Sequence, residues 1–219
     1  MSGYKEVLGL KIAVVSETSS GDKNKDVMAA LQGFGHEIIN VGMKDKSVIP
    51  ELTYIETGLL SAILLNAGIV DFVVGGCGSG QGYMNSVLQY PDVVCGLILN
   101  PLDAYLFRRI NGGNCISLSL NIGYGAAGDL NLKYIFEKLF VTEPGAGHPA
   151  HRAESQRSSR AKLIKITKQT HLPFAEIIRR MEPSILNDVL SFPGVWELIE
   201  KHQFTDMELR KALESARKR

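Results

Sequence analysis

Short apolar runs alternate with longer mixed stretches along the first two thirds of the chain. Runs typical of buried strands lie at residues 11–16, 36–41, 70–74, 93–99 and 115–120. Stretches with helical patterns lie between and after them, at residues 22–34, 51–66, 81–88, 101–109 and 129–140. Strands that are apolar on both faces and separated by helices indicate a parallel sheet covered on both sides. The pattern therefore predicts a three-layer, doubly wound α/β fold of the Rossmann-like type with about five strands.

The last third of the chain has a different pattern. Prolines 173, 183 and 193 each fit the start of a short helix, and the TDME sequence at 205–208 fits a capping box. Only one of the 22 glycines, Gly194, lies beyond residue 149. We predict an α/β domain at residues 1–150 and, at residues 151–219, an extension of four or so short helices. Because about 70 residues bury little core alone, this extension is expected to pack on the active site or on a subunit interface.

Charge and cysteine content narrow the classes of function. The net charge of +1 is the sum of −4 over residues 1–149 (10 Lys+Arg, 14 Asp+Glu) and +5 over residues 150–219 (14 and 9). Near neutrality argues against nucleic-acid binding, and the longest apolar runs are too short for a membrane span. Residues 1–6 lack the pattern of a secretory leader, and three scattered cysteines make no disulfide framework. We therefore expect a cytoplasmic protein.

Doubly wound folds bind ligands beyond the carboxyl ends of their strands. The loops at residues 16–21, 75–82, 100–101 and 120–128 are thus the places to look for function. The sequence GGCGSGQG at residues 75–82 follows a predicted strand and opens a predicted helix. It fits neither a dinucleotide fingerprint, because position 83 is Tyr83, nor a Walker loop, because position 81 is Gln81. What remains is a cradle of backbone N–H groups for an anionic oxygen, with one thiol inside it.

That thiol, Cys77, has two interpretations. A sulfur exposed to the crevice, with its pKa lowered by the helix start, would suit a base that removes a proton next to a carbonyl. The adjacent N–H groups would stabilise the enediolate oxygen as charge develops. The alternative is an inert buried cysteine, the usual state of a free thiol. Cys95 and Cys115, inside apolar strands, are interpreted as inert.

The segment VDFVVGGCGSGQG at residues 70–82 resembles the V-D-x-x-I-x-x-C-G-T-G-x-G signature of the ribose-5-phosphate isomerase B and galactose-6-phosphate isomerase family. Two further segments follow in the family's order. RRINGGN at 108–114 resembles R-x-H-N-x-x-N, and GHPAHR at 147–152 resembles G-R-H-x-x-R. The likeness spans residues 11 to about 155. It implies aldose–ketose isomerisation through an enediolate, without metal or other cofactor, at sites shared between the subunits of a homodimer or a dimer of dimers.

The resemblance also assigns roles to residues. Cys77 would move the proton between C1 and C2, and Ser79 with the backbone of Gly78, Gly80 and Gly82 would hold the oxyanion. Some members place a glutamate base where this chain has Tyr83, which leaves Cys77 as the candidate base. Sugar oxygens would be held by Glu17, Thr18 and Asn111, and the phosphate by Arg152, which offers bidentate contacts. His148 and His151, beside Arg152, are further candidates for binding the phosphate, and the alternative is that they are structural or surface histidines.

Several positions depart from the family pattern. Glu17-Thr18 replaces the D-H pair after the first strand, and Ile110 replaces the histidine expected to help open the sugar ring. His148 and Asn121 stand where the family has phosphate-binding arginines. Since a charge-assisted contact is worth about 1.5–3 kcal/mol, losing two weakens phosphate binding unless other groups replace them. An unphosphorylated or differently sized sugar is therefore a second possibility for the substrate.

The remaining candidates are weaker. Zinc binding through His148 and His151 lacks a third ligand at suitable spacing, so no metal site is predicted. Arg157, Arg160, Lys162 and Lys165 form either a solvated helix face or a contact with an acidic partner surface. The sequence thus predicts a sugar-phosphate isomerase with Cys77 as base. The alternative is a binding or regulatory protein of the same fold that has lost turnover together with the histidine at position 110.

Overall fold

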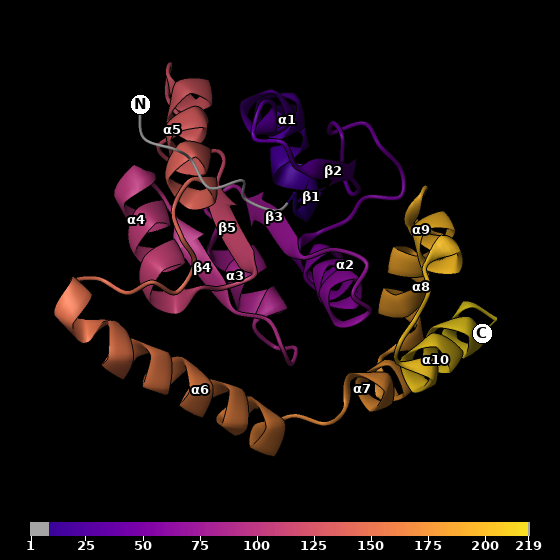
Figure 1. The fold of residues 1–219 in the computed structure, drawn as a ribbon. Helices are drawn as coiled ribbons and strands as arrows, with labels where there is room; N and C mark the ends of the chain where they lie inside the picture. The colour runs from indigo at the N-terminus through magenta and orange to yellow at the C-terminus, as the bar shows by residue number, and fades with distance from the viewer. Residues whose placement is uncertain (1–8, 219) are drawn as a thin grey trace.

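The computed structural model describes residues 9–218, which form a five-stranded sheet with helices on both faces (Figure 1). The strands are β1 (Lys11–Ser16), β2 (Glu37–Asn40), β3 (Phe72–Cys77), β4 (Cys95–Ile98) and β5 (Cys115–Ser119). All pairs are parallel, in the order β2-β1-β3-β5-β4. The strand order therefore reverses between β1 and β3, and the predicted doubly wound fold is confirmed. Residues 1–6, for which no leader is predicted, lie outside the described residues.

Two layers of helices cover the sheet. One layer contains α2 (Tyr54–Asn66) and α3 (Gln81–Val87); the other contains α1 (Asn24–Leu31), α4 (Pro101–Leu106) and α5 (Gly128–Phe140). Neighbouring strand residues face opposite layers: Val73 packs with the first and Val74 with the second. No helix within residues 9–218 has the length and apolar content needed to cross a bilayer.

Two of the predicted helices are divided in the structure. The first begins as a 3-10 helix, η1 (Thr18–Lys23), because the Glu17 carboxylate accepts a hydrogen bond from the Ser19 N–H at 3.0 Å and so caps it. Its α-helical part, α1, ends at Leu31, three residues before the predicted end. The fourth helix continues beyond α4 as a π-helical turn, η2 (Phe107–Asn111), which ends at Gly112 with a left-handed backbone.

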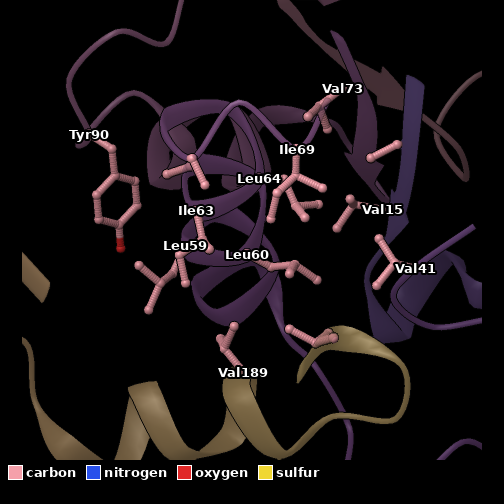
Figure 2. Packing of buried hydrophobic residues seen from close by; sticks show 14 of the residues in the cluster. Val15, Val41, Leu59, Leu60, Ile63, Leu64, Ile69, Val73, Tyr90 and Val189 are labelled. Carbon is pink, nitrogen blue, oxygen red and sulfur yellow. The ribbon is translucent and has the colours of Figure 1, made fainter. Parts of the chain in front are cut away.

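The C-terminal extension consists of η3 (Ala150–Arg152), α6 (Ala153–Thr170), α7 (Phe174–Arg180), α8 (Pro183–Ser191), α9 (Val195–Lys201) and α10 (Met207–Arg217). The four short helices are those predicted, although Asp206 rather than Thr205 caps α10. They share an apolar core with α2, and Figure 2 shows Val189 of α8 beneath Leu59 and Leu60 of α2. These four short helices are thus stabilised by packing on the α/β domain, whereas α6 buries none of its residues.

Candidate active site

Cys77 is the last residue of β3, at the position where the strand order reverses. In the β3–β5 ladder it lies opposite Ser119, and Gly76 lies opposite Ser16 of β1. Such a switch point at the carboxyl edge of a parallel sheet is the usual ligand site of doubly wound folds. The structure thus places Cys77 where the sequence predicts a site.

The environment of Cys77 corrects one expectation. Its sulfur is predicted to be open to the crevice, but Cys77 is only 6% exposed and packs in the apolar core. The chain after β5 folds back over the cysteine loop. The N–H of Leu120 donates to the Cys77 carbonyl (3.1 Å), and those of Asn121 and Ile122 donate to the Gly78 carbonyl (3.0 and 2.9 Å). These three hydrogen bonds join the chain after β5 to the cysteine loop.

Several backbone N–H groups of the glycine loop have no hydrogen-bond acceptor among the described residues. Gly80 precedes α3 with φ +77°, a left-handed conformation that only glycine adopts without strain. Within the described part of the chain, the amides of Ser79 and Gly80 have no hydrogen-bond acceptor, whereas the Gln81 N–H donates to Ser79 Oγ (3.3 Å). Gly82 lies in the first turn of α3, where a side chain would contact the Tyr54 ring. The Ser79 and Gly80 amides can therefore bind a developing oxyanion.

Ser19 joins the loop after β1 to the cysteine loop, and the sequence analysis missed it. Its hydroxyl donates to the buried Glu17 carboxylate and accepts from the Gly78 N–H at 3.1 Å. Asn121 Nδ2 donates to the Ser19 carbonyl (2.9 Å), while the Thr18 N–H donates to Leu52 (2.9 Å). Of the predicted oxyanion donors, the Gly78 amide is thus already engaged. The available signal was the place of Ser19 in the loop at residues 16–21, two positions after Glu17.

Tyr83 points into the core, where its ring lies against Gly75 of β3. Its hydroxyl lies 2.6 Å from Ser61 Oγ and 3.5 Å from Cys115 Sγ. Because Ser61 donates its proton to the Thr57 carbonyl (2.7 Å), Tyr83 must donate to Ser61. Burial, with a smaller contribution from Cys115, holds the pKa of Tyr83 well above its usual value. A neutral phenol in the core cannot serve as the base.

The other two cysteines are also interior. Cys115 is fully buried, and Cys95 lies directly opposite it in the β4–β5 ladder. The hydrogen bond with Cys115, together with burial, raises the pKa of Cys95 far above that of a free thiol. Cys95 therefore stays protonated, and Cys115 lies fully inside the core, in agreement with the interpretation of both as inert.

A Tyr83→Phe substitution tests the structural role of this tyrosine. We expect the free energy of unfolding to fall by about 1 kcal/mol, because a buried hydrogen bond to Ser61 is lost. Turnover of any substrate should not change. Chemical denaturation and steady-state kinetics measure the two effects, and a large loss of turnover in a folded variant would place the Tyr83 hydroxyl in the chemistry.

Another group of predicted site residues lies at the opposite end of the strands, where β5 begins; we call this the amino edge of the sheet. Asn111 ends η2, just before β5 begins, and is exposed. The loop that carries His148 is tied to η2 by hydrogen bonds from the Gly145 N–H to Arg108 and from the Gly147 N–H to Arg109, both 2.8 Å. Its continuation, η3, contains His151 and Arg152, which are exposed. The His148 ring packs edge-on against Tyr105 of α4, with centroids 5.6 Å apart.

The structure therefore divides the predicted site into two groups. Glu17, Thr18, Cys77, Gly78, Ser79, Gly80 and Gly82 form the carboxyl-edge group; Asn111, His148, His151 and Arg152 form the amino-edge group. In β5, Cys115 starts the strand beside Val73 and Ser119 ends it beside Cys77. Four residues of strand span about 13 Å, and the amino-edge group lies beyond the start of β5. One chain does not bring the two groups together.

A cleft of about 280 Å³ opens beside the cysteine loop. Polar groups of Ser79, Gln81, Ser119 and Asn131 line it together with the Tyr124 ring and apolar residues. None of its lining residues, all in the described part of the chain, is lysine, arginine or histidine. The residues that the structure describes also contain no group of three His, Cys, Asp or Glu side chains arranged to hold a metal. The cleft can hold uncharged sugar hydroxyls but has no cation for a phosphate.

A model of the ribose/galactose isomerase family matches residues 12–154, more than half of the chain. The chain belongs to the ribose/galactose isomerase family. The predicted resemblance is thus confirmed, and the protein is an isomerase. The matched range contains the residues of both groups, so each group derives from the family domain rather than from α7–α10.

Solved structures show how far the likeness extends within the ribose/galactose isomerases. A ribose-5-phosphate isomerase from Vibrio parahaemolyticus is 39% identical, with a TM-score of 0.90, covering 95% of this chain and 99% of that one. A 4-deoxy-L-threo-5-hexosulose-uronate ketol-isomerase, solved with a tartrate, is 37% identical, with a TM-score of 0.88, covering 94% and 98%. The type B ribose 5-phosphate isomerase of Leishmania infantum shares the fold at 16% identity and a TM-score of 0.63, over 75% of this chain and 100% of that one. Among curated proteins, none matches the chain.

Proposed function

We propose that this protein is a cofactor-independent aldose–ketose isomerase that acts on a sugar with an acidic group, with Cys77 as the base. The observation that carries the proposal is the position of Cys77 at the strand-order switch, two and three residues before the amides of Ser79 and Gly80, which have no acceptor among the described residues. A base beside preorganised donors is what proton abstraction next to a carbonyl requires.

The proposed reaction begins when the Cys77 thiolate removes the proton from C2 of the open-chain aldose. The electron pair moves to the C1 carbonyl, and the Ser79 and Gly80 amides donate hydrogen bonds to the O1 oxyanion. A proton then passes from O2 to O1, and the Cys77 thiol returns its proton to C1 to give the ketose. Atoms and electrons balance within the substrate, so no cofactor is needed.

The charged end of the substrate needs cations, and none lines the cleft beside the cysteine loop. His148, His151 and Arg152 are the candidates, and they lie at the opposite edge of the same chain. Two copies related by a two-fold axis would bring the amino-edge group of each subunit to the carboxyl-edge group of the other. We therefore propose a homodimer, or a dimer of dimers, with two shared sites in each dimer, as the family resemblance implies.

Two classes of substrate fit this arrangement. A pentose or hexose phosphate is the first, because a 39% identical relative is a ribose-5-phosphate isomerase. A uronate is the second, and a feature of the site favours it. Asn121, which replaces a phosphate-binding arginine, is a neutral amide bonded to the Ser19 carbonyl. A single carboxylate charge needs fewer cations than a phosphate, and a relative of 37% identity is named for a uronate.

Solvent exchange tests the function directly. The protein is incubated in D2O with ribose 5-phosphate and, separately, with 4-deoxy-L-threo-5-hexosulose uronate, and the products are followed by NMR. We expect deuterium at the carbon that gains the proton and ketol conversion of one substrate at least tenfold faster than of the other. Binding of both sugars without exchange or conversion would contradict the proposal and point to a binding protein.

A further inference from the structure

Ser19 places a hydroxyl at the carboxyl edge, next to the cysteine loop. Its Oγ lies 3.1 Å from the N–H of Gly78, the residue that follows Cys77. A Cβ added at Gly78 would lie 3.2 Å from Ser19 Oγ and 3.0 Å from Asn121 Nδ2, so both polar atoms lie beside the same residue. Ser19 is exposed, and its carbonyl is held by Asn121. The hydroxyl is therefore fixed beside the proposed base and is accessible to a ligand.

The Ser19 hydroxyl has one hydrogen-bonding position left. A serine hydroxyl carries one proton and two lone pairs. Here the proton is donated to the Glu17 carboxylate, and one lone pair accepts the Gly78 N–H. No other group among the described residues bonds to Ser19 Oγ. The second lone pair can therefore accept the O–H of a bound sugar.

The carboxylate that accepts the Ser19 proton is buried without a cation. Glu17 is 3% exposed, and its two oxygens accept the N–H and the hydroxyl of Ser19. None of the ion pairs within residues 9–218 includes Glu17. In this part of the chain the carboxylate has no side-chain partner except Ser19. A proton that passes from a ligand to Glu17 therefore travels through the Ser19 hydroxyl.

The other serine hydroxyls near the loop lack this arrangement. Ser119 Oγ donates to the Ile122 carbonyl at 2.8 Å, and Ser79 Oγ accepts the Gln81 N–H at 3.3 Å. Neither hydroxyl bonds to a carboxylate within the described residues. Of these three serines, Ser19 alone connects the cysteine loop to a group that can store a proton.

We propose that Ser19 and Glu17 form a relay that carries a proton from O2 to O1 of the enediolate. The relay rests on the proposed function, in which Cys77 has already removed the C2 proton. The O2 hydroxyl gives its proton to Ser19 Oγ while Ser19 gives its own proton to Glu17. The reverse transfers then deliver a proton from Glu17 through Ser19 to O1. The O2–H bond breaks, an O1–H bond forms and both side chains are restored, so no co-reactant is consumed.

A Ser19→Ala variant separates the relay from proton abstraction. The backbone N–H that caps η1 remains, so the fold should be unchanged. The variant is incubated in D2O with ribose 5-phosphate and, separately, with 4-deoxy-L-threo-5-hexosulose uronate. Deuterium should still enter C2 of the recovered aldose because Cys77 is intact, whereas conversion to the ketose should fall about 10²-fold. NMR measures both rates in one sample, and the ratio of exchange to conversion should rise.

Three further variants identify the group that stores the proton. Glu17→Gln keeps the size of the side chain but cannot take up a proton, so it should raise the same ratio. The double variant Ser19→Ala/Glu17→Gln should lose no more conversion than the worse single variant, because both residues act in one step. Ser19→Thr retains a hydroxyl and should recover most of the conversion. Ser20→Ala is the matched control, because its hydroxyl bonds to the Glu17 carbonyl (3.3 Å) rather than to the carboxylate, and its ratio should equal that of the parent.

The outcomes separate the relay from the proposed function. Equal losses of exchange and conversion in Ser19→Ala, or no loss of either, would overturn the relay and leave Cys77 as the base. Additive losses in the double variant would overturn the part of Glu17. A parent protein that neither exchanges the C2 proton nor converts either sugar would overturn the proposed function together with the relay.

Discussion

A Cys77→Ala variant should lose about 10²–10⁴-fold in kcat, the usual contribution of a general base. Exchange of the C2 proton with solvent should fall by the same factor, because both processes need the same proton transfer. Substrate affinity should change little, since the amides of Ser79 and Gly80 remain in place. NMR in D2O measures the exchange, and a coupled assay measures turnover.

The burial of Cys77 supports a different outcome of this experiment, in which the thiol takes no part in the reaction. Cys77 is 6% exposed and packs with apolar residues, which also suits an inert core thiol. An inert thiol predicts a modest loss of stability and unchanged exchange, the opposite of the result expected here. Cys95→Ala is the matched control, because it removes a thiol held in the protonated state on the neighbouring part of the sheet. Its turnover should stay near that of the parent, so equal losses in both variants would reject Cys77 as the base.

Mixing two inactive variants should restore activity. Cys77→Ala damages the carboxyl-edge group, and Arg152→Ala damages the amino-edge group about one strand length away. In a mixed dimer, each shared site takes its carboxyl-edge group from one subunit and its amino-edge group from the other. One site therefore contains both substitutions and the other contains neither. Random reassociation of equal amounts should therefore give about a quarter of the parent activity, against near zero for each variant alone.

The recovery depends on the two groups coming from different subunits. The variants are mixed at low concentration, concentrated to allow exchange of subunits, and assayed over time. A second mixture, Cys77→Ala with Gly80→Ala, places both substitutions in the carboxyl-edge group, because a side chain at Gly80 strains the left-handed backbone that presents its amide. Every site of the mixed dimer is then damaged, and the activity should stay low. Recovery in neither mixture would mean that each site forms within one chain.

The sheet and its order could be predicted with little tertiary information. Strands at residues 11–16 and 115–120 are recognisable because they are apolar on both faces, and the helices between them force parallel pairing. The location of the glycine loop could also be predicted from the sequence. Because the loop follows a predicted strand, Cys77 is expected at the carboxyl edge of the sheet. The boundaries of the first helix were less accurate, because capping by Glu17 through Ser19 starts a 3-10 turn that periodicity does not reveal.

Contacts between segments far apart in the chain could not be predicted from the sequence. Ser19 reaches Gly78 across 59 positions, and the chain after β5 closes over Cys77 by backbone hydrogen bonds that carry no side-chain signal. The extension packs on α2 through apolar faces that would equally fit a partner subunit, so pattern alone left its position open.

The sequence by itself determined the fold class, the family resemblance and the position of the cysteine loop. These depend on local periodicity and on residues adjacent in the chain. Only the tertiary structure decided that Cys77 is covered, that Tyr83 faces the core, and that Asn111 and Arg152 lie at the far edge of the sheet. The physical reason is that residues before and after a strand lie a full strand length apart in space. The order of motifs along the chain does not show at which end of the strands each one lies.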